Sequence, residues 1–472
     1  MKNHYISQFI IKRFSNAINV FDINDGKIDL NKRPSKVFYK DDIYTEELEK
    51  LMNINIESRV ANIIDQKILD KEEIRLTRKE LYLLKRYMLI ASVRNYTPKQ
   101  FVDFLKGFTS NADRYLLINK LSYAKYNINR SIHDLKLSDE EIYLNALKVY
   151  AIANTPLDIA ASELATKEML AWAIPFLEGY IAFWDAPEDK EFILSDCTMG
   201  SEYEGFHLIT GGIDISKTSY LLDRCMKKEP IELILGTQSV MYENYDFFNL
   251  SSTRTMVLIN PFFRLYHNHI IKIENEIFIP KKPDIWPAII QDRNLFDVPK
   301  NEYKLKGFYH PDDLFIYSPK VLNNEDYIYI NNLMLMYSKE VIGFNNPHEI
   351  IDTIYYHIWA ESQYGSIQKE NNDFLTVLQR ISDSLLNSPY NILIDYCMKV
   401  GKKPDEKVLL TFEKILNNIY MDFNENRYIC EYYLKNQKGL KEFTQLDFLG
   451  KGDLKIEFFK QHLEEILKRN KC

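Results

Sequence analysis

The chain has 472 residues, of which 46% are hydrophobic, 13% aromatic and 27% charged. A chain of this composition can fill a hydrophobic core, which excludes an intrinsically disordered or collagen-like protein. Lysine and arginine number 60 against 67 aspartates and glutamates, so the formal net charge is −7 at pH 7. Binding nucleic acid over a broad surface normally needs a basic field, so only a local patch of this chain could do so.

The first forty residues contain such a patch, with eight lysines and arginines against three aspartates. Lys12 and Arg13 lie in it and are candidates for binding phosphate. The alternative is an ordinary solvated charged face. Two alternating runs, Ile18–Ile23 and Lys27–Leu30, flank an Asp-Gly pair, which predicts a β-hairpin.

Helical signals dominate the next part of the chain. Apolar residues recur at helical spacing from Leu48 to Ile68. Thr77 and Glu80 form a capping box, which predicts a helix that runs to about Arg94. Further helical periodicity covers roughly 99–130 and 138–180.

Strand signals follow. Ile181–Asp185 and Glu191–Asp196 flank a turn-rich stretch and predict a second hairpin. Other expected strands are Thr253–Asn260, Tyr303–Lys306 and Asp313–Tyr317. Helical patterns resume near Asn324, after Pro347, and from about 366 to the end.

We therefore expect an α+β protein, mainly helical, with a small central antiparallel sheet and an added helical C-terminal domain. The expected parts are an N-terminal signature and hairpin (1–43), a helical region (44–180), a sheet-containing region packed with helices (181–365) and the helical C-terminal domain (366–472).

The compartment is suggested by the cysteines and the N-terminus. Five widely separated cysteines include no Cys-x-x-Cys, which argues against a disulfide framework or a thiolate zinc site. No apolar signal-peptide region is visible at the start. The longest apolar stretch, Met169–Trp184, is shorter than the ~20 residues that span a bilayer. We expect a soluble cytoplasmic protein with no membrane partner.

Familiar cofactor motifs are missing from the sequence, which has no phosphate-binding Gly-x-x-x-x-Gly-Lys and no dinucleotide fingerprint. His348 and Asp352 only partly match a zinc helix, because the second histidine is replaced. His267 and His269 lack a visible third ligand. The metal therefore stays unknown, although a divalent ion is one candidate cofactor.

The most specific motif is His4-Tyr5-Ile6-Ser7-Gln8-Phe9, followed by Arg13. It resembles the opening signature of a bacterial domain-of-unknown-function family, DUF4238, in which proline stands at the place of Ser7. Ile193–Asp196 is similar to the family's strand ending in Ser-Asp-Asn-Pro, although Cys197 and Thr198 replace the last two residues. The resemblance covers about residues 3–365. Its members look like cytoplasmic bacterial proteins, some linked to phage defence.

The resemblance draws attention to several positions, and their residue types suggest a chemistry. Glu57 and Arg94 lie beside or within apolar helical stripes, where a charge must be paired or functional. Asp196 follows an apolar strand, after Ser195. If these residues meet around His4, the histidine acts as general acid/base and the carboxylates orient water or a divalent ion.

Candidate catalytic residues are therefore His4, Glu57 and Asp196, and candidate substrate-binding residues are Gln8, Lys12, Arg13, Arg94 and Ser195. The alternative is a polar network that locks the N-terminus onto the helices.

Three functions remain open. The leading one is a cytoplasmic bacterial effector that cleaves RNA or DNA, held through the local basic patch, in phage defence. The second is a non-enzymatic sensor or interaction protein whose C-terminal helices bind a protein partner. The third is a metal hydrolase that acts on a small phosphorylated metabolite.

Overall fold

The computed structural model describes residues 2–41, 43–107, 128, 130–206, 241–259, 289–290, 314–347, 350–357 and 388–401. These residues form a mixed α+β protein, as expected. The chain divides into two compact units, one of Met1–Asp22 with Ile28–Asn345 and one of Ile23–Lys27 with Asn346–Cys472. No described helix combines the length and the apolar character needed to cross a membrane.

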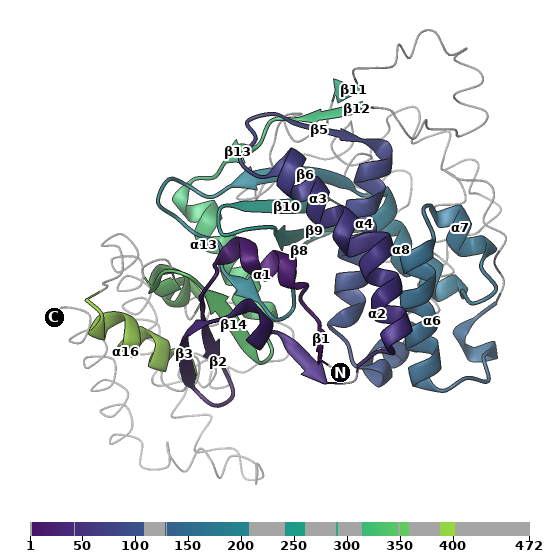
Figure 1. Ribbon diagram of the computed structural model, residues 1–472, viewed down its shortest axis with the longest axis horizontal. Helices are drawn as coiled ribbons and strands as arrows, with labels where there is room; N and C mark the ends of the chain where they lie inside the picture. The colour runs from purple at the N-terminus through teal and green to yellow at the C-terminus, as the bar shows by residue number, and fades with distance from the viewer. Residues whose placement is uncertain are drawn as a thin grey trace, which may run out of the picture. The chain divides into compact units, whose positions relative to one another are not determined.

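Most described helices of the first unit lie in its first half, whereas α13 lies near its end (Figure 1), and residues 98–107 are also helical. The labelled helices are α1 (Gln8–Phe14), α2 (Glu46–Met52), α3 (Ser58–Ile63), α4 (Arg78–Arg94), α6 (Asp139–Ile152), α7 (Pro156–Ala161), α8 (Lys167–Glu178) and α13 (Asn324–Tyr337). Shorter turns are the 3-10 turns η1 (Pro34–Lys36) and η4 (Ile132–Asp134) and the π-helical turns η2 (Asn53–Glu57) and η3 (Ile64–Ile68). In the second unit, residues 350–357 are helical and α16 covers Asn391–Lys399.

The described strands form four sheets instead of the single small sheet that we expected. The largest has the order β13 (Lys320–Val321), β6 (Tyr180–Asp185), β10 (Arg254–Ile259), β9 (Met241–Asn249) and β8 (Gly200–Phe206), and only the β13–β6 pair is parallel. A second sheet has the order β3 (Lys27–Lys32), β2 (Ile18–Asp22), β14 (Val341–Phe344) and β7 (Leu194–Ser195). The two smaller sheets are β11 (Ile289–Ile290), β12 (Leu314–Tyr317) and β5 (Ile74–Thr77), and β1 (Lys2–His4) with β4 (Tyr39–Asp41).

Several local predictions are confirmed. The first hairpin forms as β2 and β3, and Gly26 between them has a φ of 61°, a left-handed conformation that glycine adopts without strain. Helix α4 begins at the Thr77–Glu80 capping box and ends at Arg94. Both agreements rest on contacts within a few residues, which a sequence pattern encodes directly.

The prediction of a hairpin between Ile181–Asp185 and Glu191–Asp196 is wrong. Strand β6 pairs with β10 and β13 in the five-stranded sheet, whereas β7 pairs with β14 in another sheet. Strand β6 is matched along its whole length by β10, and this long-range pairing outweighs the local turn signal.

Residues 46–68 form one continuous helical segment in which α2, η2, α3 and η3 follow without a break. Every fourth residue of this segment is apolar and buried: Leu48, Met52, Ile56, Val60, Ile64 and Ile68. In an α-helix of about 3.6 residues per turn, such a stripe would drift by about 40° at each step. The wider π turns compensate for the drift, so the whole stripe stays on one face.

The helices α2, α4, α6 and α8 pack against one another beside the five-stranded sheet (Figure 1). Tyr87 of α4 meets Phe248 of β9 edge to face, with ring centroids 5.4 Å apart. Both side chains are almost fully buried. This contact joins the helical layer to the sheet. The last residue of α4 is Arg94, which is one of the candidate site residues.

Candidate functional site

His4 and Gln8 lie at the start of the first unit, His4 as the last residue of β1 and Gln8 as the first of α1. The amide Nε2 of Gln8 lies 3.4 Å from Nδ1 of His4. The imidazole also packs against the ring of Tyr39, which is its partner in β4. The expected proximity of His4 and Gln8 is therefore present, and the strand pairing keeps His4 from lying on a frayed end.

Ser7, Glu57 and Arg94 form a compact buried network. The Ser7 hydroxyl donates to Oε1 of Glu57 at 2.8 Å, and Nη1 of Arg94 donates to the same oxygen at 2.5 Å. The Arg94 side chain is 1% exposed and that of Glu57 16%. Oε1 is the only oxygen of Glu57 that forms a hydrogen bond with a described residue. The other oxygen, Oε2, is available for a further bond.

The surroundings of Arg94 stabilise its protonated, positively charged form. Burial alone lowers the pKa of Arg94, but the neighbouring Glu57, Tyr44 and Glu49 raise it, and the net direction is upward. Its guanidinium lies 5.4 Å from the ring centroid of Tyr44, and Nη2 contacts Sδ of Met52 at 3.3 Å. Burial raises the pKa of Tyr44 to about 12, so this hydroxyl stays neutral. Arg94 is a permanent cation whose charge is balanced inside the protein.

Arg13 is bound internally as well. Its guanidinium donates to Oδ1 of Asp65 through Nε at 2.9 Å and Nη2 at 2.6 Å, to the carbonyl of Phe9 and to that of Ala61. The side chain is 8% exposed and lies over the Phe9 ring. Lys12, by contrast, is exposed. Of the two predicted phosphate ligands, only Lys12 is open to solvent.

Asp196 follows β7, as the strand prediction suggested, but its carboxylate faces inward. Oδ1 accepts the amide of Lys339 at 2.9 Å, and Oδ2 accepts those of Glu340 and Val341 at 2.7 and 3.1 Å. Burial raises the pKa of Asp196, although these three hydrogen bonds work in the opposite direction. The Asp196 carboxylate therefore stabilises the turn between α13 and β14.

Ser195 supports the same turn. Its buried hydroxyl accepts a hydrogen bond from Ser338 at 2.8 Å and one from the amide of Cys197 at 3.1 Å. The Cys197 thiol is buried, donates to the carbonyl of Tyr337, and has its pKa raised to about 12 by burial. A thiol in this environment stays protonated and is a poor nucleophile.

The end of α4 connects the two groups of residues. Arg94 binds Glu57, while the next residue, Asn95, donates through Nδ2 to the carbonyl of Cys197 and to Oγ1 of Thr198. The carbonyl of Asn95 also accepts the ammonium of Lys339 at 2.9 Å. Four of the predicted residues therefore lie in two clusters, Glu57 with Arg94 and Asp196 with Ser195, and the consecutive residues Arg94 and Asn95 at the end of α4 connect the two.

A metal site is not evident among these residues. In the described part of the chain, no group of three or more histidines, cysteines or acidic residues is arranged to hold an ion. His267, His269 and His348 lie outside the described residues. Asp352 is described and buried.

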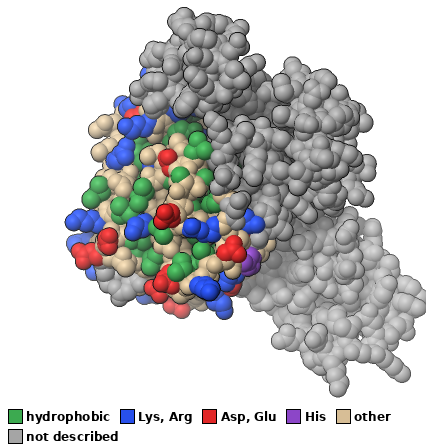
Figure 2. Space-filling model, turned by 90° about the vertical axis from the view of Figure 1, so that its right-hand side faces the viewer, with side chains coloured by type: hydrophobic (Ala, Val, Ile, Leu, Met, Phe, Trp, Pro, Cys, Tyr) green, Lys and Arg blue, Asp and Glu red, His purple; other side chains and the backbone are tan. Residues whose placement is uncertain are grey.

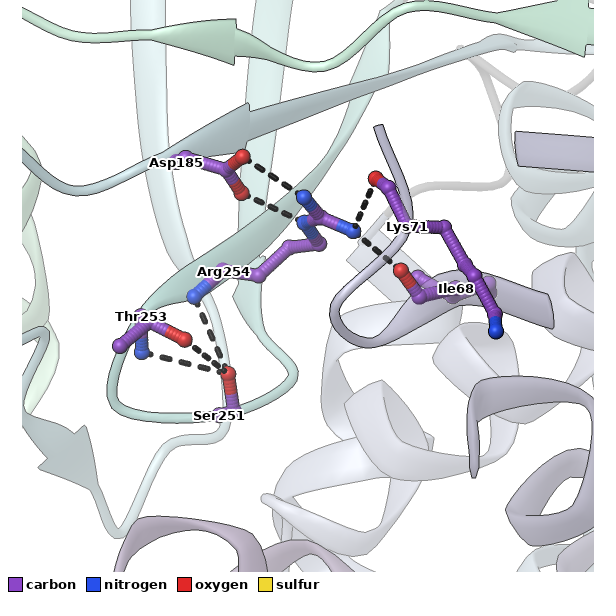
Figure 3. Close-up of polar contacts among 6 residues, drawn as sticks. All are labelled: Ile68, Lys71, Asp185, Ser251, Thr253 and Arg254. Carbon is purple, nitrogen blue, oxygen red and sulfur yellow. Dashed lines mark hydrogen bonds and ion pairs between the residues drawn. The ribbon is translucent and has the colours of Figure 1, made fainter. Parts of the chain in front are cut away.

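A buried ion pair that the sequence did not suggest lies at one end of β6 and β10 (Figure 3). Arg254 binds both carboxylate oxygens of Asp185, at 2.5 and 2.6 Å, and its third nitrogen donates to the carbonyls of Ile68 and Lys71. This arginine ties the end of the helical segment 46–68 to the sheet. Only the strand register, which places Asp185 opposite Arg254, could have revealed the pair.

A second missed arginine, Arg86, lies in the middle of α4. It donates to the carbonyls of Tyr150 and Ala151 and to Oδ1 of Asn154, at the end of α6. Burial lowers its pKa to about 10. The negative end of the helix dipole of α6 balances this charge, so its role is structural.

The family comparison agrees with the motif at the start of the chain. A family model described as a protein of unknown function, DUF4238, matches residues 2–268, which include His4, Glu57, Arg94 and Asp196. The match ends about a hundred residues before the limit of 365 that the resemblance suggested. No curated protein and no solved structure matches the chain. The chain belongs to the DUF4238 family of proteins of unknown function.

Proposed function

We propose that this chain is a non-enzymatic sensor or interaction protein, of the kind that works in a bacterial defence or stress system. One observation carries the proposal: the charged residues of the candidate site form hydrogen bonds with other groups inside the protein. Arg13 and Arg94 each bind a carboxylate, and both oxygens of Asp196 accept backbone amides. A nuclease would need such cations and carboxylates to face its substrate.

The surface charge also favours a protein partner over nucleic acid. Figure 2 shows a face on which lysines and arginines alternate with aspartates and glutamates, with hydrophobic side chains between them. Within the basic N-terminal stretch, Lys40 pairs with Glu340 and Lys32 with Asp29. These pairs reduce the field that would attract a polyanion.

The partner surface that we propose lies on the C-terminal helices, which we take to be an added helical domain. Their described member, α16, buries Leu393 and Cys397 and exposes Ile392 (47%) and Val400 (45%). Exposed aliphatic residues beside a buried stripe are suited to a helix-to-protein contact. This surface belongs to the second unit.

A pull-down with covalent crosslinking in the source cells tests the proposal. The chain with Ile392→Glu and Val400→Glu should lose a partner that the parent chain captures, while its thermal midpoint stays unchanged. The matched control is Leu30→Glu, which alters an exposed aliphatic residue in β3. Equal capture by all three chains would contradict the proposal.

The second candidate is cleavage of RNA or DNA in the cytoplasm, and the available Oε2 of Glu57 favours it. An oriented carboxylate could act with water or with a divalent ion. If so, His4→Ala and Glu57→Gln should each lower nuclease activity by ~10²–10⁴-fold at equal folded fraction. A parent chain that cleaves neither RNA nor DNA, with or without Mg²⁺ or Mn²⁺, excludes this candidate.

A further inference from the structure

The N-terminal segment, residues 2–14, is attached to a single face of the helical segment 46–68. Nδ2 of Asn3 contacts Glu49 at 3.4 Å, and Ser7 donates to Glu57. Arg13 then bonds Asp65. The three acidic residues are spaced by eight, and each follows a residue of the buried apolar stripe.

This alignment depends on the π turns. Residues 49 and 65 would point in very different directions on an ideal α-helix of about 3.6 residues per turn. With η2 and η3 present, Glu49, Glu57 and Asp65 all meet the same short segment. The helical segment thus directs three carboxylates toward the N-terminal segment, while α4, α6 and β5 pack against the same helical segment.

The attached segment has little structure of its own. Its strand has three residues and pairs, among the described strands, with β4 alone, and its helix α1 has seven residues. Neither an isolated two-stranded sheet nor a helix this short is stable alone in water. The segment is therefore ordered by the elements around it: β1 pairs with β4, α1 packs against η1, and polar side chains of the segment bind the helical segment 46–68.

Each of the three carboxylates is bonded through one oxygen only. Within the described part of the chain, Oε1 of Glu49, Oε2 of Glu57 and Oδ2 of Asp65 accept no hydrogen bond. The Asp65 side chain is 57% exposed. An incoming cation can therefore reach Asp65 before Arg13 has left it, which allows a stepwise exchange.

We propose that residues 2–14 are an autoinhibitory strap, and that the helical face beneath them is a binding site for a partner segment of the same chemistry. That segment would carry an apolar helical turn followed by an arginine. This binding site lies in the first unit and goes beyond the proposed function, whose partner surface is on α16 of the second unit. The strap itself supplies the pattern that the partner must match: a polar start, buried Ile10 and Phe14, and the cation of Arg13.

The test uses a fluorescent peptide with the sequence of residues 2–15 and the full-length chain. Fluorescence anisotropy should detect saturable binding, and the Arg13→Ala chain should bind roughly tenfold more tightly, because its own strap competes less well. Circular dichroism verifies that this variant is folded. Glu73→Gln, which removes an exposed carboxylate outside the strap site, should leave the affinity unchanged.

A charge exchange adds a second readout. The Asp65→Arg chain should lose the parent peptide and bind a peptide carrying Arg13→Asp. The absence of saturable binding to both the parent and the Arg13→Ala chains overturns the proposal, as does binding that ignores the charge at Asp65. If the pull-down finds no partner that depends on α16 while the peptide still binds, that result would count against the proposed C-terminal surface alone.

Discussion

Arg94 and Glu57 are joined by a hydrogen bond of 2.5 Å between Nη1 and Oε1, with the arginine side chain almost completely removed from solvent. The two residues come from different helical segments, α4 and η2, and the Ser7 hydroxyl shares the same carboxylate oxygen. Because Ser7 belongs to the N-terminal signature, this one oxygen joins three separate parts of the sequence.

Removing either charge should destabilise the protein strongly. Arg94→Met or Glu57→Gln leaves the other charge buried without a partner, and we expect a loss of roughly 3–5 kcal/mol from the free energy of unfolding. The double variant should recover part of this loss, because no unpaired charge remains. Urea unfolding of the four chains measures the coupling. A cost below about 1 kcal/mol for both single variants would show that the pair is not a structural anchor.

Ser7 should tolerate proline, the residue that the family signature is expected to carry there. Its φ of −59° matches the proline ring, and among the described residues its amide donates no hydrogen bond. Ser7→Ala loses the hydroxyl, which donates to Glu57 and accepts from Arg94, and should cost about 1 kcal/mol. Ser7→Pro should cost no more than this, because the ring also restricts the unfolded chain. Thermal midpoints of both variants test the comparison, and unfolding of Ser7→Pro would contradict it.

Thr198 should not tolerate proline, although the resemblance suggests proline there too. Its φ is 58°, a left-handed conformation that proline cannot adopt, and its amide donates to the carbonyl of Ser195 at 3.0 Å. We expect Thr198→Pro to cost roughly 3 kcal/mol or more. Thr198→Asn is the matched control, since asparagine accepts this conformation more readily. Equal stability of the two variants would mean that the turn has another conformation.

The π turn η2 should accept the loss of one residue. Deleting the exposed Asn53 changes the spacing of the apolar stripe at that point from four to three, which an ordinary α-helix accommodates. The same deletion at the exposed Lys148, inside α6, should prevent folding, because it rotates the rest of a regular helix by about 100°. Circular dichroism and urea unfolding of both variants provide the measurement. Failure of both to fold would contradict this account of the helix.

Glu80 should make the stability of the protein depend on pH in the acidic range. Burial raises the pKa of Glu80, but hydrogen bonds from Lys67 and Thr77 lower it by more than burial raises it. The pKa of Glu80 is therefore below the usual 4.5. A lowered folded-state pKa means that this stabilisation is present above the unfolded value and is lost as the pH falls through the folded value. The difference in thermal midpoint between the parent and Glu80→Gln should therefore shrink below about pH 4. A difference independent of pH would contradict this role.

Features that depend on neighbouring residues could be predicted from the sequence, and features that depend on distant partners could not. The capping box at Thr77 and the turn at Gly26 are local, and both are present. The carboxylate of Asp196 was expected at a strand end and lies there, but its partners are amides more than 140 residues away. No pattern around Asp196 identifies them.

The stripe from Leu48 to Ile68 shows the same distinction within one element. Its apolar residues predicted a helix, and the helix is present. The strict spacing of four was the available signal for π turns, because a regular α-helix favours alternating steps of three and four. The pairing of Arg13 with Asp65 follows from that geometry and not from local preference.

The signature residues Ser7 and Arg13 tie the N-terminal segment to the helical segment 46–68. Hydrogen exchange of the amides of residues 2–14 tests this attachment most directly, in the parent chain, in Glu57→Gln and in Asp185→Asn, which breaks the other buried ion pair, with Arg254. We predict that Glu57→Gln accelerates exchange in residues 2–14 at least tenfold, while Asp185→Asn leaves that segment protected. Unchanged exchange of residues 2–14 in Glu57→Gln, or an equal acceleration in both variants, would contradict the account.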